Sequence, residues 1–202
     1  GHCTTILTNR KISAEYFSFH TTDAEYQLLE KIRHTPKTIF LAGNADFALG
    51  IVTGNNKKYI SSVKTKDNEV ILKGSDICKY HTNPSPNYIV FNPQNFQQVA
   101  PIEMYRAPEK LLYRFISSQL VFAYDDKQTL SLNSCNVVIP KLEGLHIKYI
   151  LAILNSRVAQ FIYKMDFHSV KVLRSHIENI PIPDVDADTQ NIIIQTVEPL
   201  IN

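Results

Sequence analysis

Polar and basic side chains gather in four turn-like segments of this sequence, where they could hold phosphates and read base edges. The first segment is Thr53-Gly54-Asn55-Asn56-Lys57-Lys58, in which Gly and Asn permit a tight turn. Amide side chains can pair bidentately with adenine edges, and lysines neutralise phosphates. The other segments contribute Lys73 and Lys79, then Lys127, Gln128 and Thr129, and finally Lys171 and Arg174. A plain charged surface hairpin is the alternative for the first two segments, and the residues alone favour that alternative for the first.

Residue patterns of common enzyme chemistries are missing from the sequence. There is no GxGxxG or GxxxxGK[ST] phosphate loop and no GxSxG elbow. Asn92-Pro93-Gln94-Asn95-Phe96 lacks the second proline of the Asn-Pro-Pro-aromatic motif of amino-group DNA methyltransferases, so it predicts a turn after a strand. Asp125-Asp126 could form a metal or nuclease pair. However, Lys127 follows directly and no third carboxylate has a useful spacing, so we expect a solvated turn.

Cysteine and histidine spacing predicts neither a disulfide framework nor a metal site. The three cysteines are widely separated and form no CxxC, and the seven histidines show no HxxxH or HExxH spacing. Without an apolar leader or a run of 18 apolar residues, the sequence predicts a cytoplasmic protein. The chain begins Gly1-His2 rather than with Met, so we expect a piece of a larger protein.

Charge is distributed unevenly along the 202 residues, although the net charge is only +2. All 21 Lys and Arg lie between Arg10 and Arg174, against 14 acids in residues 1–177, so this part carries +7. The last 25 residues hold five acids and no cation. A moderately basic body tolerates a polyanionic partner without requiring one.

Apolar periodicity and turn signals predict an α+β fold with a mixed, mostly antiparallel β-sheet and helices late in the chain. Thr22-Asp23-Ala24-Glu25 resembles a capping box that starts a short helix to about residue 34. Short apolar runs predict strands through residues 38–105. They include a strand over 57–63. We expect helices over 108–118, over about 145–165 as one long amphipathic helix, and after Asp186 or Asp188 at the C-terminus.

Five segments in this order resemble the TaqI-like C-terminal specificity domain, the target-recognition domain of adenine-specific DNA methyltransferases and fused restriction–modification enzymes. The segments are Gly50–Asn56, Val70–Tyr80, Phe122–Ser134, Tyr149–Ser156 and Ile177–Pro183. The resemblance covers about residues 38–185. Ile180-Pro181-Ile182-Pro183, followed by a helix with Gln190, is also similar to the end of a recognition half in type I specificity subunits.

The resemblance implies a domain that docks on the DNA major groove and helps to choose the sequence to be methylated. Residues 1–37 would then be a linker with a short helix that joins a catalytic domain outside this chain, residues 38–185 the target-recognition domain, and 186–202 a C-terminal helix. S-adenosylmethionine and the catalytic motif would belong to the covalently linked methyltransferase domain, so no cofactor is expected here. Members of that family usually have a longer stretch between the strands at Tyr88–Phe91 and Phe122 than this sequence, in which that stretch is compact.

Three hypotheses for the function follow. The first is a module that binds double-stranded DNA sequence-specifically, taken from an adenine-specific methyltransferase or a bifunctional enzyme that is also an endonuclease. If it neutralises about five phosphates, log affinity should fall against log salt with a slope near −4 to −5. The second is a protein–protein assembly module that meets its partner through the acidic C-terminal helix. The third is an independent nuclease that uses Asp125 and Asp126.

Overall fold

The computed structural model describes residues 37–166 and 169–202. The chain divides into two compact units, residues 1–34 and 35–202, and all described residues belong to the second. The helix expected to end near residue 34, and the linker that contains it up to residue 36, therefore lie outside the described residues. No described helix is both long and apolar enough to cross a membrane.

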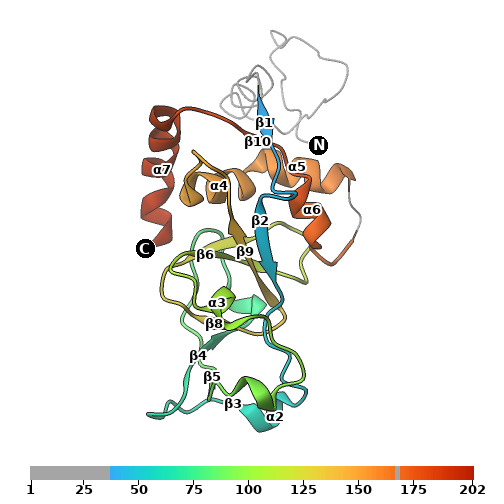
Figure 1. The fold of residues 1–202 in the computed structure, drawn as a ribbon, viewed down its shortest axis with the longest axis vertical. Helices are drawn as coiled ribbons and strands as arrows, with labels where there is room; N and C mark the ends of the chain where they lie inside the picture. The colour runs from blue at the N-terminus through green and yellow to red at the C-terminus, as the bar shows by residue number, and fades with distance from the viewer. Residues whose placement is uncertain (1–36, 167–168) are drawn as a thin grey trace, which may run out of the picture. The chain divides into compact units, whose positions relative to one another are not determined.

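A four-stranded antiparallel sheet forms the centre of this unit (Figure 1). Its strand order is β2-β9-β6-β7, with β2 at Ala45–Ala48, β9 at Cys135–Pro140, β6 at Lys110–Arg114 and β7 at Phe122–Asp125. Successive residues of β6 serve opposite faces: Leu111 and Tyr113 join one hydrophobic cluster, and Leu112 joins the other. The sheet is thus buried on both faces, as the two-residue period of a strand requires.

A second sheet has the strand order β3-β5-β4-β8, and β4 and β8 run parallel. The strands are β3 at Ile60–Ser61, β5 at Tyr88–Ile89, β4 at Glu69–Leu72 and β8 at Leu130–Ser131. The short helices α2 at Asn56–Tyr59 and α3 at Ile102–Tyr105, and the 3-10 turns η1 at Gly74–Asp76 and η2 at Pro93–Asn95, lie between β2 and β6 in the sequence. We call the sheet formed by β3, β5, β4 and β8 the small sheet.

One face of the central sheet packs on the small sheet, and helices cover the opposite face. They are α4 at Ile147–Leu154, α5 at Arg157–Asp166, α6 at Arg174–Glu178 and α7 at Ala187–Ile201. A two-stranded antiparallel pair, β1 at Thr38–Ile39 and β10 at Ile182–Pro183, brings the start and the late part of the described chain together. The N-cap of α7 is Asp186, whose carboxylate accepts a hydrogen bond from the Thr189 N–H at 2.8 Å. The α+β class, the mostly antiparallel pairing and the C-terminal helix are as the sequence predicts.

The single helix expected over residues 145–165 is wrong, because the chain breaks between α4 and α5. Asn155 is buried, and its side chain bonds the backbone N–H and C=O of Phe122, each at 2.9 Å. The Ser156 hydroxyl then accepts from the Ala159 N–H at 3.1 Å, which caps the second helix. Both residues have the short polar side chains that compete with a continuing helix.

The helix expected over 108–118 is also wrong, since Lys110–Arg114 form the central strand β6. Adjacent leucines fit one helical face and both faces of a buried strand equally well, and the two cores select the strand. The strand expected over 57–63 begins only at Ile60, because α2 occupies the preceding turn.

Candidate nucleic-acid interface

The turn at Thr53 and helix α2 form the first candidate element. Thr53 is buried and its hydroxyl accepts from the Asn55 N–H at 3.1 Å and donates to the Asn56 Oδ1. Asn55 caps the helix, because its Oδ1 accepts from the Lys58 N–H at 3.2 Å. The amide oxygens of both asparagines are therefore engaged within the turn, and Lys57 and Lys58 remain exposed at its surface.

The turn between β7 and β8 forms the second element. Asp125, expected in a solvated turn, is instead buried and pairs with the fully buried Lys110 at 2.6 Å. Its two carboxylate oxygens also accept from the Thr129 N–H at 3.0 Å and the Thr129 hydroxyl at 2.7 Å. Burial lowers the pKa of Lys110, while the charge of Asp125 raises it. Lys127 and Gln128 are exposed beyond this anchor.

Arg106 connects this turn to the small sheet. Its guanidinium makes a bidentate ion pair with Glu69, at 2.7 and 2.9 Å, and donates from Nη1 to the Gln128 carbonyl at 2.8 Å. It also lies 5.3 Å from the centroid of the Phe91 ring. A planar guanidinium suits both contacts at once, since it can fork to a carboxylate and stack on an aromatic face.

A row of half-buried aromatic rings continues from Phe91 to α2. Phe91 and Phe96 have their centroids 6.4 Å apart, and Tyr59 meets Phe96 edge-on at 5.4 Å. The Lys58 ammonium lies 5.1 Å from the Tyr59 ring. An unbroken series of contacts thus runs from Lys58 to Gln128, 70 residues later in the chain.

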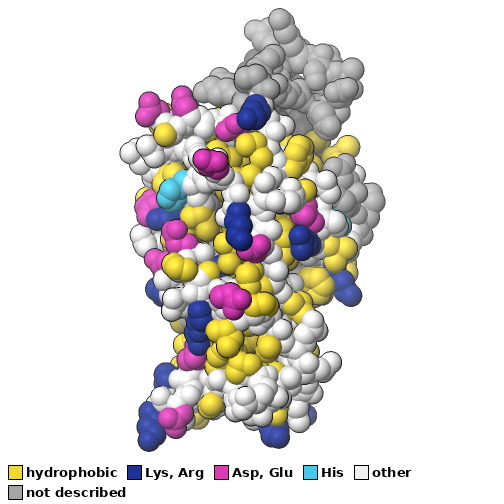
Figure 2. Space-filling model, viewed as in Figure 1, with side chains coloured by type: hydrophobic (Ala, Val, Ile, Leu, Met, Phe, Trp, Pro, Cys, Tyr) yellow, Lys and Arg dark blue, Asp and Glu magenta, His cyan; other side chains and the backbone are white. Residues whose placement is uncertain are grey.

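Sheet topology explains why the two elements meet. Ile60 and Glu69 both pair with Ile89, and β8 lies parallel to β4. The residues before β3, before β4 and before β8 therefore reach the same end of the small sheet. We call the surface there the basic–aromatic surface, defined by Lys57, Lys58, Tyr59, Phe91, Phe96, Arg106, Lys127 and Gln128. Within residues 35–202, Figure 2 shows Lys and Arg side chains at the end formed by α2 and the β3–β4 connection, with a hydrophobic patch next to them.

Lys73 and Lys171 belong to a different region. The Gly74 N–H, next to Lys73, donates to the Ser134 hydroxyl at 2.9 Å, and the Ser134 carbonyl accepts from the Phe115 N–H at 3.0 Å. The Lys171 ammonium lies 5.9 Å from the Phe115 ring. Lys73 follows the C-terminal end of β4, so this pair lies at the opposite end of the small sheet from the basic–aromatic surface.

Lys79 and Arg174 are used within the fold. The Lys79 ammonium donates to the Asn155 carbonyl at 3.2 Å, and burial together with the charge of Arg157 lowers the pKa of Lys79. Arg174 pairs with Glu178 at 3.2 Å and stacks 4.7 Å from the Phe47 ring. Both side chains stabilise neighbouring elements, so they are weaker candidates for phosphate contacts.

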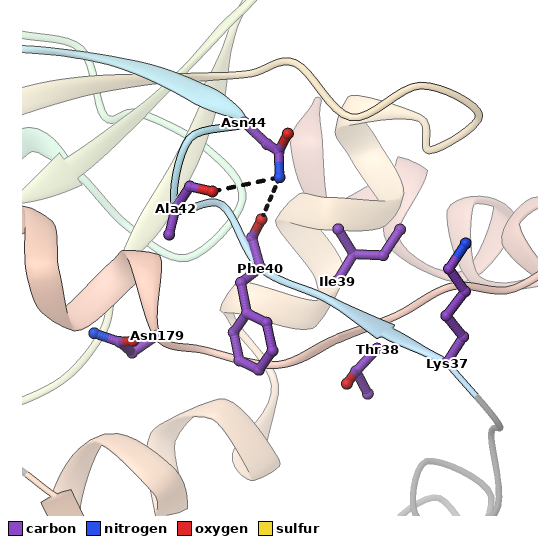
Figure 3. Close-up of a pocket in the computed structure, with 7 residues that line it drawn as sticks. All are labelled: Lys37, Thr38, Ile39, Phe40, Ala42, Asn44 and Asn179. Carbon is purple, nitrogen blue, oxygen red and sulfur yellow. Dashed lines mark hydrogen bonds between the residues drawn. The ribbon is translucent and has the colours of Figure 1, made fainter.

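An open pocket beside β1 does not offer catalytic chemistry. Its lining residues are Lys37, Thr38, Ile39, Phe40, Ala42, Asn44 and Asn179 (Figure 3). Asn44 donates its amide protons to the Phe40 and Ala42 carbonyls, and Lys37 pairs with Asp184 at 3.4 Å. The Lys37 amine is thus engaged in an ion pair, and no carboxylate, histidine or cysteine is among the described lining residues. In the part of the chain that the structure describes, no three His, Cys, Asp or Glu side chains group as a metal site.

Sequence reasoning missed Arg106, Phe91, Phe96 and the Lys110–Asp125 pair. Arg106 stands alone between Ile102–Tyr105 and Pro108, and nothing local marks its role. The aromatic residues were assigned to strands or turns, and only the pairing of β5 with β3 and β4 brings them next to α2. Lys110 was placed on a helix, where it would not face Asp125.

Comparison with known proteins supplies the family. The family model of the TaqI-like C-terminal specificity domain matches residues 69–182. A search of curated protein sequences finds no significant match.

Solved structures share the fold at low sequence identity. A chain of a type I R-M system complex aligns with a TM-score of 0.56 and 14% identity over 87% of this chain and 42% of its own. The HsdS subunit from Thermoanaerobacter tengcongensis aligns with a TM-score of 0.54 and 13% identity, over 88% of this chain and 43% of its own. The type IIG restriction endonuclease BpuSI aligns with a TM-score of 0.50 and 13% identity, over 85% of this chain and 28% of its own. This chain thus spans less than half of the length of each of these proteins.

Proposed function

Since this chain belongs to the TaqI-like C-terminal specificity domain family, we propose that it is the DNA target-recognition module of a restriction–modification protein. It would bind double-stranded DNA through the basic–aromatic surface and position the target for a catalytic domain elsewhere in the parent. We propose as that parent an adenine-specific DNA methyltransferase, or a bifunctional enzyme that also carries an endonuclease. S-adenosylmethionine would then bind the linked domain rather than this chain.

The observation that carries the proposal is the meeting of two polar, basic turns at one end of the small sheet. Duplex recognition needs cations for phosphates and polar side chains for base edges, both held on a rigid scaffold. Lys57, Lys58 and Lys127 supply exposed cations. The Arg106 and Asp125 contacts hold the second turn from its backbone side, so its exposed side chains are free to face a ligand.

A salt titration of DNA binding tests the proposal. Replacing Lys57, Lys58 and Lys127 by alanine removes three phosphate contacts. The slope of log affinity against log salt should therefore become shallower by about 3 from its expected value near −4 to −5. The matched control replaces Lys37, Lys141 and Lys164, exposed lysines of other elements, and removes the same charge. A wild-type affinity that does not respond to salt, or equal effects of the two triple variants, would contradict the proposal.

A contact with protein is the second candidate role, and it concerns α7. This helix packs on α4, with Val197 buried and with an ion pair between Lys148 and Glu198 at 2.5 Å. It nevertheless leaves Ile192 and Leu200 exposed, at 68% and 49%. Replacing both by glutamate should leave DNA binding intact. If the helix meets another subunit of the parent system, the same change should weaken that association in a size measurement.

A nuclease role for Asp125 and Asp126 gains no support from the geometry. Both oxygens of Asp125 are engaged by Lys110 and Thr129, so the carboxylate has no open position for a metal ion. Metal-dependent cleavage by the purified chain, lost in Asp126→Ala, would revive that hypothesis.

A further inference from the structure

Gln128 has a backbone conformation that its side chain does not favour. Its φ is 54°, in the left-handed region that residues with a Cβ rarely adopt. Glycine would fill this position without strain. The Gln128 side chain is exposed, and within the described residues its amide makes no hydrogen bond. The fold therefore gains nothing from the amide group, and a glycine would fill this position with less strain.

The backbone on the C-terminal side of Gln128 is fixed by a buried ion pair. Asp125 accepts from both the N–H and the hydroxyl of Thr129, and it is itself held by Lys110. Lys110 has a second anchor in the Tyr105 carbonyl, at 2.8 Å. The carboxylate can rotate little because both of its oxygens are hydrogen-bonded, so Thr129 is held in one position.

The backbone of Gln128 itself is fixed by Arg106. The guanidinium donates to the Gln128 carbonyl while its bidentate pair with Glu69 prevents it from turning away. The backbone around Gln128 is thus fixed by hydrogen bonds, whereas its side chain is not. Such an arrangement reduces the entropy that an exposed side chain loses when it binds, because only its own rotamers remain to be ordered.

From this geometry we propose that Gln128 is a specificity-determining residue that reads one base edge in the major groove, adenine being the base that its donor–acceptor pair fits. The primary amide offers one donor and one acceptor side by side, which matches N7 and N6–H₂ of adenine. Arg106, Asp125 and Lys110 are positioning residues, since they act on Gln128 through its backbone or through Thr129. This inference rests on the proposed function, because it assigns the base reader within the same surface.

Selection from a pool of duplexes with a randomised core, followed by sequencing of the bound fraction, tests the inference on the full chain. Gln128→Gly should leave the unfolding midpoint unchanged or raised, because the strain is relieved. It should also reduce the preference for adenine at one position by about 5- to 150-fold, the range expected for loss of one bidentate pair. Gln128→Glu leaves only acceptors and should move that preference toward cytosine, whose N4 is a donor.

Two further variants separate a reading role from a structural one. Gln195→Ala removes an exposed glutamine from α7 and should leave base preference unchanged. Thr129→Val breaks the hydroxyl bond to Asp125 and should relax the preference at the same position, whereas Thr129→Ser, which retains the hydroxyl, should keep it.

The outcomes distinguish this inference from the proposed function. If the wild-type chain enriches a sequence and Gln128→Gly enriches the same sequence equally strongly, the reading role of Gln128 is overturned and the proposed function stands. If the wild-type chain enriches no sequence at all, both are overturned. A shift in preference at one position in Gln128→Glu, with other positions retained, supports both.

Discussion

Breaking the Lys110–Asp125 pair from one side should cost far more stability than removing both partners together. Lys110 is 0% exposed and Asp125 5%, and their ion pair is 2.6 Å long. Lys110→Met removes the ammonium and keeps the length of the side chain. Asp125→Leu removes the carboxylate and puts a somewhat larger apolar side chain in its place.

The size of the effect follows from what each change leaves unpaired. Lys110→Met leaves a buried carboxylate whose remaining partners are the Thr129 N–H and hydroxyl. Asp125→Leu leaves a buried ammonium with one carbonyl partner, that of Tyr105. Loss of one partner of a buried pair typically costs about 3–5 kcal/mol, whereas replacing both by packed apolar groups is often nearly neutral. We expect about 3–5 kcal/mol for each single variant and about 1–2 kcal/mol for the double variant, because Thr129 and Tyr105 still lose their partner groups.

Urea unfolding followed by far-ultraviolet circular dichroism measures the free energy of unfolding of the wild type, the two single variants and the double variant. A double-mutant cycle then gives the coupling energy between the two side chains. The expected coupling is at least about 4 kcal/mol, provided that the slope with urea is the same in all four proteins. Additive single effects, in which the double variant loses their full sum, would refute the reasoning. That result would mean that the two groups stabilise the turn independently and that burial does not make each depend on the other.

Three other changes have expected outcomes. Gln190→Leu should lower the free energy of unfolding by about 2–4 kcal/mol in urea, because the buried Gln190 amide bonds three backbone groups at 2.7, 2.8 and 3.0 Å. Gly50→Ala should lower the thermal midpoint severely, since a Cβ there would lie 2.1 Å from the Leu132 carbonyl oxygen; an unchanged midpoint would contradict the close packing of these two chain segments. Burial lowers the pKa of His176, whose Nδ1 accepts from the Leu173 N–H at 3.1 Å, so the fold holds the neutral ring and stability falls as pH drops below about 6.5. His176→Gln keeps an acceptor without a titrating group, and its thermal midpoint should fall less than that of the wild type between pH 7.5 and pH 5.

Sequence patterns predicted local structure well where one signal dominated. The strand at Glu69–Leu72 lies where the apolar run predicts it, and the C-terminal helix is capped by Asp186, one of the two carboxylates that the sequence offers. The helix over 145–165 failed because its apolar spacing is continuous through Asn155 and Ser156, and only the pairing of Asn155 with Phe122 in another element shows the break. The helix expected over 108–118 is wrong for a related reason. The hydrophobic clusters on the two faces of β6 decide between helix and strand, and a short sequence window shows neither cluster.

The candidate site was predictable in its parts and not in its assembly. The turns at Asn55–Lys58 and Lys127–Thr129 were identified by the chemistry of their side chains, and their roles in DNA binding stay predictions. Their proximity depends on the parallel pairing of β4 with β8 and on one arginine that contacts both Glu69 and Gln128. A sequence read in short windows ranks Lys79 beside Lys58, although the first is bonded to Asn155 and the second is exposed.

Two unfavourable features meet within four residues of the β7–β8 turn, and their coincidence supports a functional reason for both. A buried ion pair contributes little net stability compared with apolar side chains of similar size, and a left-handed glutamine adds strain. Glycine at position 128 would remove the strain, whereas the buried pair also bonds the Tyr105 carbonyl and the Thr129 N–H and hydroxyl. Together they hold the main chain of an exposed amide in one orientation next to a lysine. A turn required only to connect β7 to β8 would not need that orientation, whereas a turn that reads a base edge would.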